Sequence, residues 1–110
     1  MDQDQDAIDV EEYGKRGEKP PVASRYRIRV DKTYHIVSQS SMTGREILGL
    51  VGKKPEEYYL DEKLHGAPPQ RIAADEVVEF AKHKTERFMT LPRTETEGVQ
   101  PMPDSSRRGI

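Results

Sequence analysis

Few side chains in this 110-residue chain could do acid–base or metal chemistry. Of the three histidines, we expect His35 on the outward face of a strand, and His65 and His83 in loops. Zinc binding together with Asp61 or Glu62 would need a ligand spacing that none of these histidines has. We therefore predict no metal site.

General acid–base catalysis needs two carboxyl groups held in different environments around a cleft. The adjacent acidic pairs of the chain fall instead in expected turns or helix starts, where they would be solvated. These pairs are Glu56-Glu57, Asp61-Glu62 and Asp75-Glu76. We therefore predict no catalytic residues and no cofactor, and a protein that is not an enzyme.

A row of arginines, Arg25, Arg27 and Arg29, alternates with Tyr26 and apolar residues in one predicted strand. Such a row could bind phosphate groups. Recognition of RNA would normally add exposed aromatic side chains for base stacking, but Tyr26 falls on the opposite, apolar face. The formal net charge of the chain is also negative, at -2. The arginine face is therefore predicted to be solvated or to contact protein, with no nucleic acid as a partner.

The chain contains no cysteine, so it offers no disulfide, thiolate ligand or thiol nucleophile. Its apolar run over residues 47–51 is interrupted by Gly49. A helix that crosses a membrane needs about 20 apolar residues. The acidic N-terminus also lacks the basic region of a secretory signal. We expect a cytoplasmic protein with no membrane partner.

Charge and composition divide the chain into three parts. Residues 1–23 contain seven acidic and three basic residues and end in a linker rich in glycine and proline. Like charges repel one another and bury nothing, which predicts a disordered acidic tail and linker. Apolar periodicity is confined to residues 24–93, the predicted domain. Residues 94–110 have no periodicity and are predicted to form a flexible C-terminal tail.

The predicted domain begins with a β-hairpin. Arginines and apolar residues alternate over residues 25–30, which is typical of a strand buried on one face. Residues 33–37 are again of types that favour strands. Asp31-Lys32 between them is short enough for a tight turn, so the two strands are predicted to pair.

A short helix is predicted after the hairpin. Thr43 and Glu46 have the spacing of a capping box, in which each side chain accepts a hydrogen bond from a backbone N–H. Apolar residues follow at helical spacing, and Gly52 suits the left-handed conformation that ends a helix. A helix of about eight to ten residues is unstable alone in water, so it must pack on the hairpin.

The remaining segments are shorter. Strands are predicted over residues 58–60 and 70–72, with irregular structure over residues 61–69. Residues 75–80 form a turn of helix or an extended packing segment, and the last strand runs over residues 86–91. A helix between a hairpin and returning strands predicts an α+β fold. This fold is a β-grasp, a mixed sheet of four to five strands crossed by one short helix.

Two orientations stay open in these strands. In the last strand, either Phe88 or the pair Met89 and Leu91 faces the core. Successive side chains of a strand point to opposite faces, so one of Tyr58 and Tyr59 must face outward. That tyrosine could mark a partner surface.

The order and spacing of these segments carry a resemblance to a known family. The residues involved are 26–30, 43–48, 59–60 and 86–93. Together they resemble the multiubiquitin domain family of bacterial ubiquitin-like proteins. The resemblance implies a modifier whose C-terminus is attached to protein targets. It also implies three partner enzymes: an activating enzyme, a conjugating enzyme and a JAB-type metallopeptidase.

The last four residues, Arg107-Arg108-Gly109-Ile110, fit this implied role. They are similar to the mature end of ubiquitin, where an arginine precedes glycine. Gly109 has no Cβ to obstruct attack on its carboxyl group, and Arg107 and Arg108 could dock on an acidic enzyme surface. The resemblance thus places conjugation at Gly109 and enzyme binding at the two arginines. Ile110 implies a precursor that is processed between Gly109 and Ile110.

Two functions from different classes remain open. In the first, the chain is a protein modifier that is activated and conjugated through Gly109. In the second, it is a β-grasp interaction module that is never conjugated, and its tails act as tethers. The two differ at Gly109, because conjugation needs its free carboxylate whereas a tether tolerates any ending.

Overall fold

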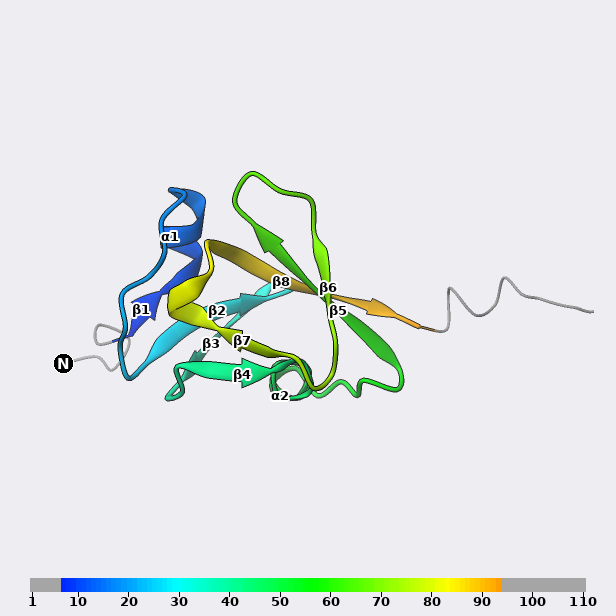
Figure 1. Cartoon of the computed structure of the whole chain (residues 1–110). Helices are drawn as coiled ribbons and strands as arrows, with labels where there is room; N and C mark the ends of the chain where they lie inside the picture. The colour runs from blue at the N-terminus through cyan, green and yellow to red at the C-terminus, as the bar shows by residue number, and fades with distance from the viewer. Residues whose placement is uncertain (1–6, 94–110) are drawn as a thin grey trace, which may run out of the picture.

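The computed structural model describes residues 7–93, which form one sheet of six strands, a second sheet of two strands and short helices (Figure 1). The elements in chain order are β1 (Ile8–Asp9), α1 (Val10–Lys15), β2 (Tyr26–Val30), β3 (Thr33–Val37), β4 (Ser41–Thr43), α2 (Gly44–Leu50), β5 (Tyr58–Leu64), β6 (Gln70–Ile72), β7 (Val77–Glu79), the 3-10 helix η2 (Phe80–Lys82) and β8 (Thr85–Pro92).

The large sheet is mixed. Its order is β1-β2-β8-β5-β6, with β3 on the other edge of β2. β2 pairs antiparallel with β3 and parallel with β8, and β5 pairs antiparallel with β8 and β6. The predicted hairpin and α+β class are confirmed, and this arrangement is compatible with a ubiquitin-like fold. The predicted number of four to five strands is wrong, because β1 adds a strand and β4 and β7 form a separate pair.

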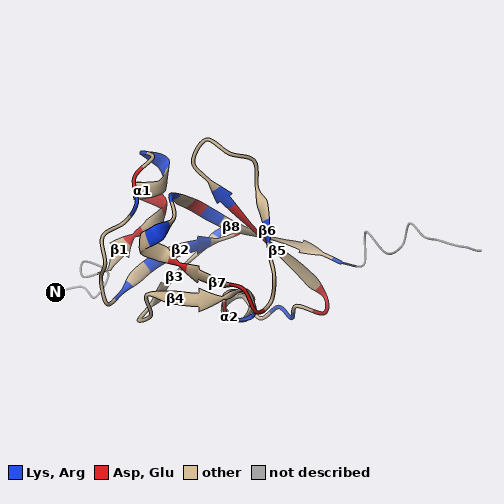
Figure 2. Ribbon diagram, viewed as in Figure 1, with Lys and Arg blue, Asp and Glu red and all other residues tan. Residues whose placement is uncertain are grey.

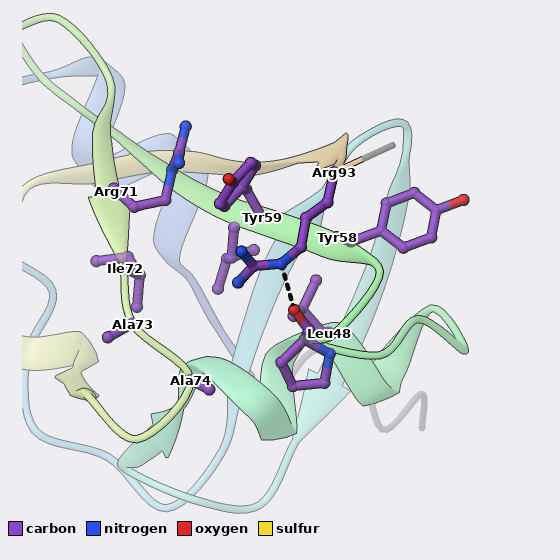
Figure 3. A pocket seen from close by; sticks show the side chains of 10 residues that line it. Leu48, Tyr58, Tyr59, Arg71, Ile72, Ala73, Ala74 and Arg93 are labelled. Atoms are coloured by element: carbon purple, nitrogen blue, oxygen red, sulfur yellow. Dashed lines mark hydrogen bonds between the residues drawn. The ribbon is translucent and has the colours of Figure 1, made fainter. Parts of the chain in front are cut away.

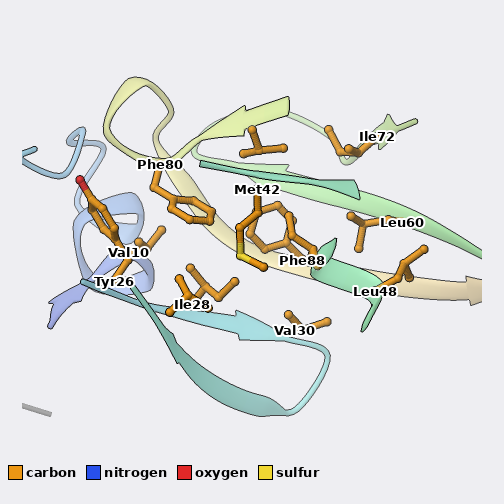
Figure 4. Close-up of a cluster of buried hydrophobic side chains, with 13 residues drawn as sticks. Val10, Tyr26, Ile28, Val30, Met42, Leu48, Leu60, Ile72, Phe80 and Phe88 are labelled. Atoms are coloured by element: carbon orange, nitrogen blue, oxygen red, sulfur yellow. The ribbon is translucent and has the colours of Figure 1, made fainter. Parts of the chain in front are cut away.

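The apolar side chains of the sheet and of α2 form one core (Figure 4). Tyr26, Ile28 and Val30 are fully buried, as the alternation in β2 predicts. Phe88 of β8 is also fully buried, whereas Leu91 is 40% exposed, which settles the open orientation of this strand. The core also includes Met42 of β4, Val78 of β7 and Phe80 of η2, so it joins both sheets.

The capping box of α2 is confirmed. Thr43 Oγ1 accepts from the N–H of Glu46 at 3.2 Å, and Glu46 Oε1 accepts from the N–H of Thr43 at 2.9 Å. The helix has seven residues, so it is slightly shorter than predicted. Gly52 has the predicted positive φ of 71°.

β5 is longer than predicted. Residues 61–64, expected to be irregular, continue the strand because β8 runs beside it through seven residue pairs. An acidic residue at position 62 obscured the alternation, since Glu62 points into the core with Leu60. His35 was expected on the outward face of its strand. It lies instead on the face that carries the buried Ile28, because the two residues pair in the hairpin.

The N-terminal segment is the largest correction. Sequence predicted disorder for residues 1–23, but β1 and α1 occupy residues 8–15 and Val10 is 1% exposed. Like charges repel one another among neighbours in sequence, but the charges that hold this segment come from distant residues. In the fold, Asp9 and Glu11 lie beside the arginines of β2 (Figure 2). Residues 1–6 of the predicted acidic tail and residues 94–110 of the predicted C-terminal tail lie outside the described residues.

Asp31 ties the turn of the hairpin to β8. Its Oδ1 accepts from the N–H of Thr90 at 2.9 Å, and its Oδ2 accepts from the Thr90 hydroxyl at 2.7 Å. Lys53 Nζ approaches Oδ2 to 3.4 Å. Burial alone would raise the pKa of Asp31, but the hydrogen bonds of Thr90 and the charge of Lys53 lower it below its ordinary value. The charged carboxylate therefore stabilises the position of β8.

We expect Asp31→Asn to reduce the acid sensitivity of the fold. Because the pKa of Asp31 is lower in the folded chain, its contribution is fully present above about pH 4 and is lost as the pH falls through the lowered value. The variant should lose about 1–2 kcal/mol of unfolding free energy at neutral pH. Asparagine tolerates the φ of 55° at this position, so the turn is kept.

Urea unfolding from neutral to acidic pH measures this effect. The free energy of unfolding should fall less steeply with acid in Asp31→Asn than in the wild type. Some slope should remain, because the pKa of Glu11 is also lowered. Identical acid slopes for the two proteins would contradict the role assigned to Asp31.

Candidate functional site

Arg93 is the last residue that the structure describes, and we name its position the exit of the domain. Its backbone N–H donates to the carbonyl of Glu57 at 2.8 Å, and its Nε donates to the carbonyl of Pro55 at 2.6 Å. Both carbonyls belong to the loop between α2 and β5. The preceding strand, β8, is an inner strand of the sheet. The exit of the chain is therefore held on the domain body.

Two arginines stack on the aromatic ring beside this exit. The guanidinium carbons of Arg71 and Arg93 lie 3.9 and 4.1 Å from the ring centroid of Tyr59, and Figure 3 shows the ring between them. Nε of Arg71 also donates to Oδ1 of Asp61 at 2.6 Å. Leu91 lies opposite Tyr59 in the pairing of β5 with β8. We name Tyr59, Arg71, Leu91 and Arg93 the exit surface.

A pocket of about 260 Å³ opens next to the exit surface (Figure 3). Its apolar lining includes Leu48, Leu60 and Ile72, and Arg71 and Arg93 line it as well. No acidic residue of the described part of the chain lines it. Small-molecule sites usually have roughly 300–1,000 Å³. The pocket is therefore smaller than most small-molecule sites, and its lining combines apolar and aromatic side chains with two arginines.

A glycine of the capping motif holds one wall of this pocket. A Cβ on Gly44 would collide with the backbone carbonyl of Ala73, so only glycine lets the two backbones approach this closely. The N–H of Arg45 donates to the carbonyl of Ala74 at 2.9 Å. The start of α2 thus positions residues 73 and 74 at the pocket.

A second polar group, the acid–arginine cluster, consists of Asp9, Glu11, Arg27, Arg29 and Tyr34. Glu11 accepts from Arg29 at 2.9 Å and from the Tyr34 hydroxyl at 2.8 Å. Asp9 lies 3.3 Å from Arg27, whose guanidinium lies 4.2 Å from the Tyr34 ring centroid. Two arginines of the face predicted to be solvated or to contact protein therefore contact acids of the same chain.

The charges of this cluster stabilise one another. Burial alone would raise the pKa of Glu11, but hydrogen bonds from Tyr34, Arg29 and Lys15 lower it below its ordinary value. The hydrogen bond to Glu11 raises the pKa of Arg29. Both groups are therefore held in their charged forms, which leaves Arg29 engaged within the chain.

The acidic pair Asp61-Glu62, predicted to be solvated, is divided by the alternation of β5. Asp61 faces Arg71, whereas Glu62 is fully buried and accepts from the Thr85 hydroxyl at 2.6 Å. His83 Nδ1 lies 3.0 Å from the same carboxylate oxygen of Glu62. Within residues 7–93, no group of three or more His, Cys, Asp or Glu side chains could hold a metal ion. Glu62 is a buried polar link between β5 and β8.

Comparison with protein families identifies the domain. The family model for Multiubiquitin matches residues 26–93, which is more than half of the chain. This chain belongs to the multiubiquitin family. The match confirms the resemblance seen in the sequence and indicates a ubiquitin-like domain. No curated protein and no solved structure matches the chain.

The match does not cover the whole described part of this multiubiquitin chain. β1 and α1 precede the matched region, although they pack on the domain. No helix of the part that the structure describes is long and apolar enough to cross a membrane.

The residues that the sequence predicts for conjugation, processing and enzyme binding lie outside the described residues of this multiubiquitin chain. They are Arg107, Arg108, Gly109 and Ile110. The structure brings together Tyr59, Arg71 and Arg93 instead, a group that sequence reasoning missed. One signal was present, because one residue of the pair Tyr58-Tyr59 had to face outward. Arg71 could not be placed beside Tyr59 without the longer β5, whose Asp61 pairs with Arg71.

Proposed function

We propose that this multiubiquitin-family chain is a protein modifier with a β-grasp body and no catalytic activity of its own. The observation that carries the proposal is the family match over residues 26–93. The anchored exit at Arg93 supports it, because a modifier must present its C-terminal segment from a fixed point of the body.

Gly109 is the group that reacts in this proposal. A JAB-type metallopeptidase uses water to cleave the amide bond between Gly109 and Ile110, which frees the Gly109 carboxylate. An ATP-dependent activating enzyme joins this carboxylate to AMP and releases pyrophosphate. A cysteine thiolate then displaces AMP to form a thioester, which passes to a cysteine of the conjugating enzyme. A nucleophile of the target displaces that thiol and keeps the acyl group.

The exit surface serves as an enzyme-binding surface in this sequence of reactions. Fifteen residues separate Arg93 from Gly109, so the tail can span up to about 50 Å when extended. An enzyme can therefore hold Tyr59, Arg71 and Leu91 while the distant Gly109 enters its active site. The stacked arginines need little reordering on binding, which reduces the entropic cost of association.

The first test follows the mass of the chain during incubation with its activating enzyme, conjugating enzyme, metallopeptidase and ATP. A chain that ends at Gly109 should form an adduct that needs ATP and is cleaved by thiols. The full-length chain should need the metallopeptidase first. Ile110 places the terminal carboxylate about 3.3–3.6 Å too far along the chain, beyond the misplacement of about 1 Å that reaction geometry tolerates.

Gly109→Glu is the matched control and should abolish the adduct in both forms of the chain. If the product keeps Ile110 and is attached through it, the processing step is wrong. If no attachment occurs under any of these conditions, the interaction module with tethering tails becomes the better function. The exit surface and its pocket would then be the binding site of that module.

The exit surface gives a prediction of its own. Arg71→Gln should lower the rate of thioester formation about tenfold, which corresponds to about 1.4 kcal/mol. It removes the cation stacked on Tyr59 but leaves the core intact. Arg45→Gln is the control, because this exposed arginine has only a 3.9 Å ion pair with Glu56. Equal rates for the two variants, measured with equally stable proteins, would exclude the exit surface from enzyme binding.

A further inference from the structure

β1 and α1 cover the open edge of β2 beside β8, a site that we name the groove. β2 pairs with β3 along one edge over its whole length, but on the other edge β8 pairs only with its last residue. β1 takes the open part of that edge, where Ile8 pairs with Tyr26 and Asp9 with Arg27 in parallel. The family match begins only at Tyr26. Residues 8–15 are therefore an added segment seated on the matched domain.

The groove recognises the apolar side of this segment by burial and by close backbone contact. Val10 is 1% exposed and belongs to the core, and the half-buried Ile8 packs against the same core. A Cβ on Gly14 would collide with the backbone carbonyl of Thr85. The absence of a side chain at this position thus lets α1 lie directly on β8.

The acid–arginine cluster recognises the polar side of the same segment. Along residues 8–11, apolar and acidic residues alternate, and each acidic residue contacts one arginine of β2. Asp9 also accepts from the N–H of Glu12 at 3.3 Å and caps α1. The groove therefore selects a specific pattern of two apolar and two acidic residues followed by a helical turn.

The link between the segment and the domain is long and is itself held on the domain, because Pro20 is buried and Ala23 packs against the core. Ten residues, 16–25, connect α1 to β2 and can span up to about 33–36 Å. Tyr26 holds this linker through its hydroxyl, which donates to the carbonyl of Pro21 at 2.8 Å and accepts from the N–H of Ala23 at 2.9 Å. Apart from the linker, the segment makes its own contacts with the groove, and these do not depend on which chain supplies it.

We propose that the groove is also a docking site for residues 8–15 of a second copy of this chain, so that two chains exchange β1 and α1. Each exchanged segment makes the contacts that the resident segment makes. The exchange then costs those linker contacts that the new path breaks, among them the hydrogen bonds of Tyr26, and the association of two chains. The charges fix the choice of occupant, because a second copy brings both acids at the spacing of Arg27 and Arg29.

Disulfide trapping tests the exchange in the full chain, which has no cysteine of its own. The single variants Asp9→Cys and Arg27→Cys are mixed at high concentration in a thiol–disulfide buffer. Neighbouring strands lie about 4.8 Å apart, within the range of about 4.4–6.8 Å between the Cα atoms of a disulfide. Mass spectrometry without reduction should show the heterodimer in several-fold excess over both homodimers together.

Arg45→Cys in place of Arg27→Cys is the matched control and should give only random pairing. The double variant Asp9→Cys with Arg27→Cys should form an internal disulfide when dilute. Failure to do so would show that residues 8–15 are not seated in the groove as described. Exchange is overturned if the heterodimer never exceeds random pairing. A second readout avoids substitutions, because isotopically labelled and unlabelled wild-type chains should form mixed dimers in native mass spectrometry.

A peptide of residues 7–16 decides between specific and general recognition. In excess it should suppress the trapped heterodimer, and the same peptide with Asp9→Asn and Glu11→Gln should suppress it several-fold less. If an unrelated acidic peptide suppresses the heterodimer equally well, the groove recognises negative charge alone. That result would overturn the second copy as its occupant.

Discussion

Ile28→Asp should abolish the cooperative unfolding transition of the chain. Ile28 is fully buried at the centre of β2 and packs within the core (Figure 4). Burial of a carboxylate without a partner costs several kcal/mol, which is comparable to the total stability of about 5–15 kcal/mol of a small domain. Leu48→Asp should have the same effect from the side of α2, since Leu48 is 2% exposed.

Two controls separate the charge from its position. Ile36→Asp places the same charge on the outer face of the hairpin, opposite Arg27, and should leave the transition in place. Ile28→Val keeps the site apolar and should cost about 1 kcal/mol. Circular dichroism during heating measures all four variants. A normal melting transition in Ile28→Asp would show that the core face is assigned wrongly.

The second large effect is expected at Gly14. In Gly14→Ala, the new Cβ meets the backbone carbonyl of Thr85, and neither backbone can move aside without opening the groove. α1 should therefore lift from β8, which exposes Val10 and weakens the contacts of Glu11 with β2. We expect a loss of about 2–4 kcal/mol of unfolding free energy, in the range of buried steric defects.

Gly49→Ala makes the same chemical change in the other helix. A Cβ at Gly49 meets nothing within 4 Å, so alanine should stabilise α2 by roughly 0.5–1 kcal/mol. The two glycine substitutions should thus have opposite signs in urea unfolding. Hydrogen exchange should be faster at residues 10–15 in Gly14→Ala alone. Shifts of the same sign in both variants would contradict the close seating of α1.

Local patterns explain which elements could be predicted from the sequence. The alternation in β2, the turn at Asp31 and the capping box of Thr43 each depend on residues a few positions apart. The sequence therefore predicted the hairpin, the start of α2 and most of the buried face of the sheet. The β-grasp plan and the family rested on the order of these elements.

Long-range partners explain what the sequence could not predict. The acids of residues 9–11 meet arginines 18 positions away, so their local repulsion was no guide to disorder. Glu62 interrupts an apolar pattern but is paired with Thr85, 23 positions away. The stack on Tyr59 combines residues from β5, from β6 and from the position just after β8. Conjugation at Gly109 stays a prediction, because it lies outside the described residues.

The placement of β8 between β2 and β5 also bears on how the chain responds to mechanical force. Tension on an attached C-terminus runs along β8, and its hydrogen bonds to β5 are perpendicular to that direction. Seven residue pairs between β5 and β8 would then share the load in shear instead of opening one after another. Tension on the N-terminal segment would reach β1, which two residue pairs hold to β2. A molecular machine that unfolds proteins by pulling would therefore meet high mechanical resistance when it pulls on the C-terminal end of the domain. It would meet low resistance when it pulls on the N-terminal end.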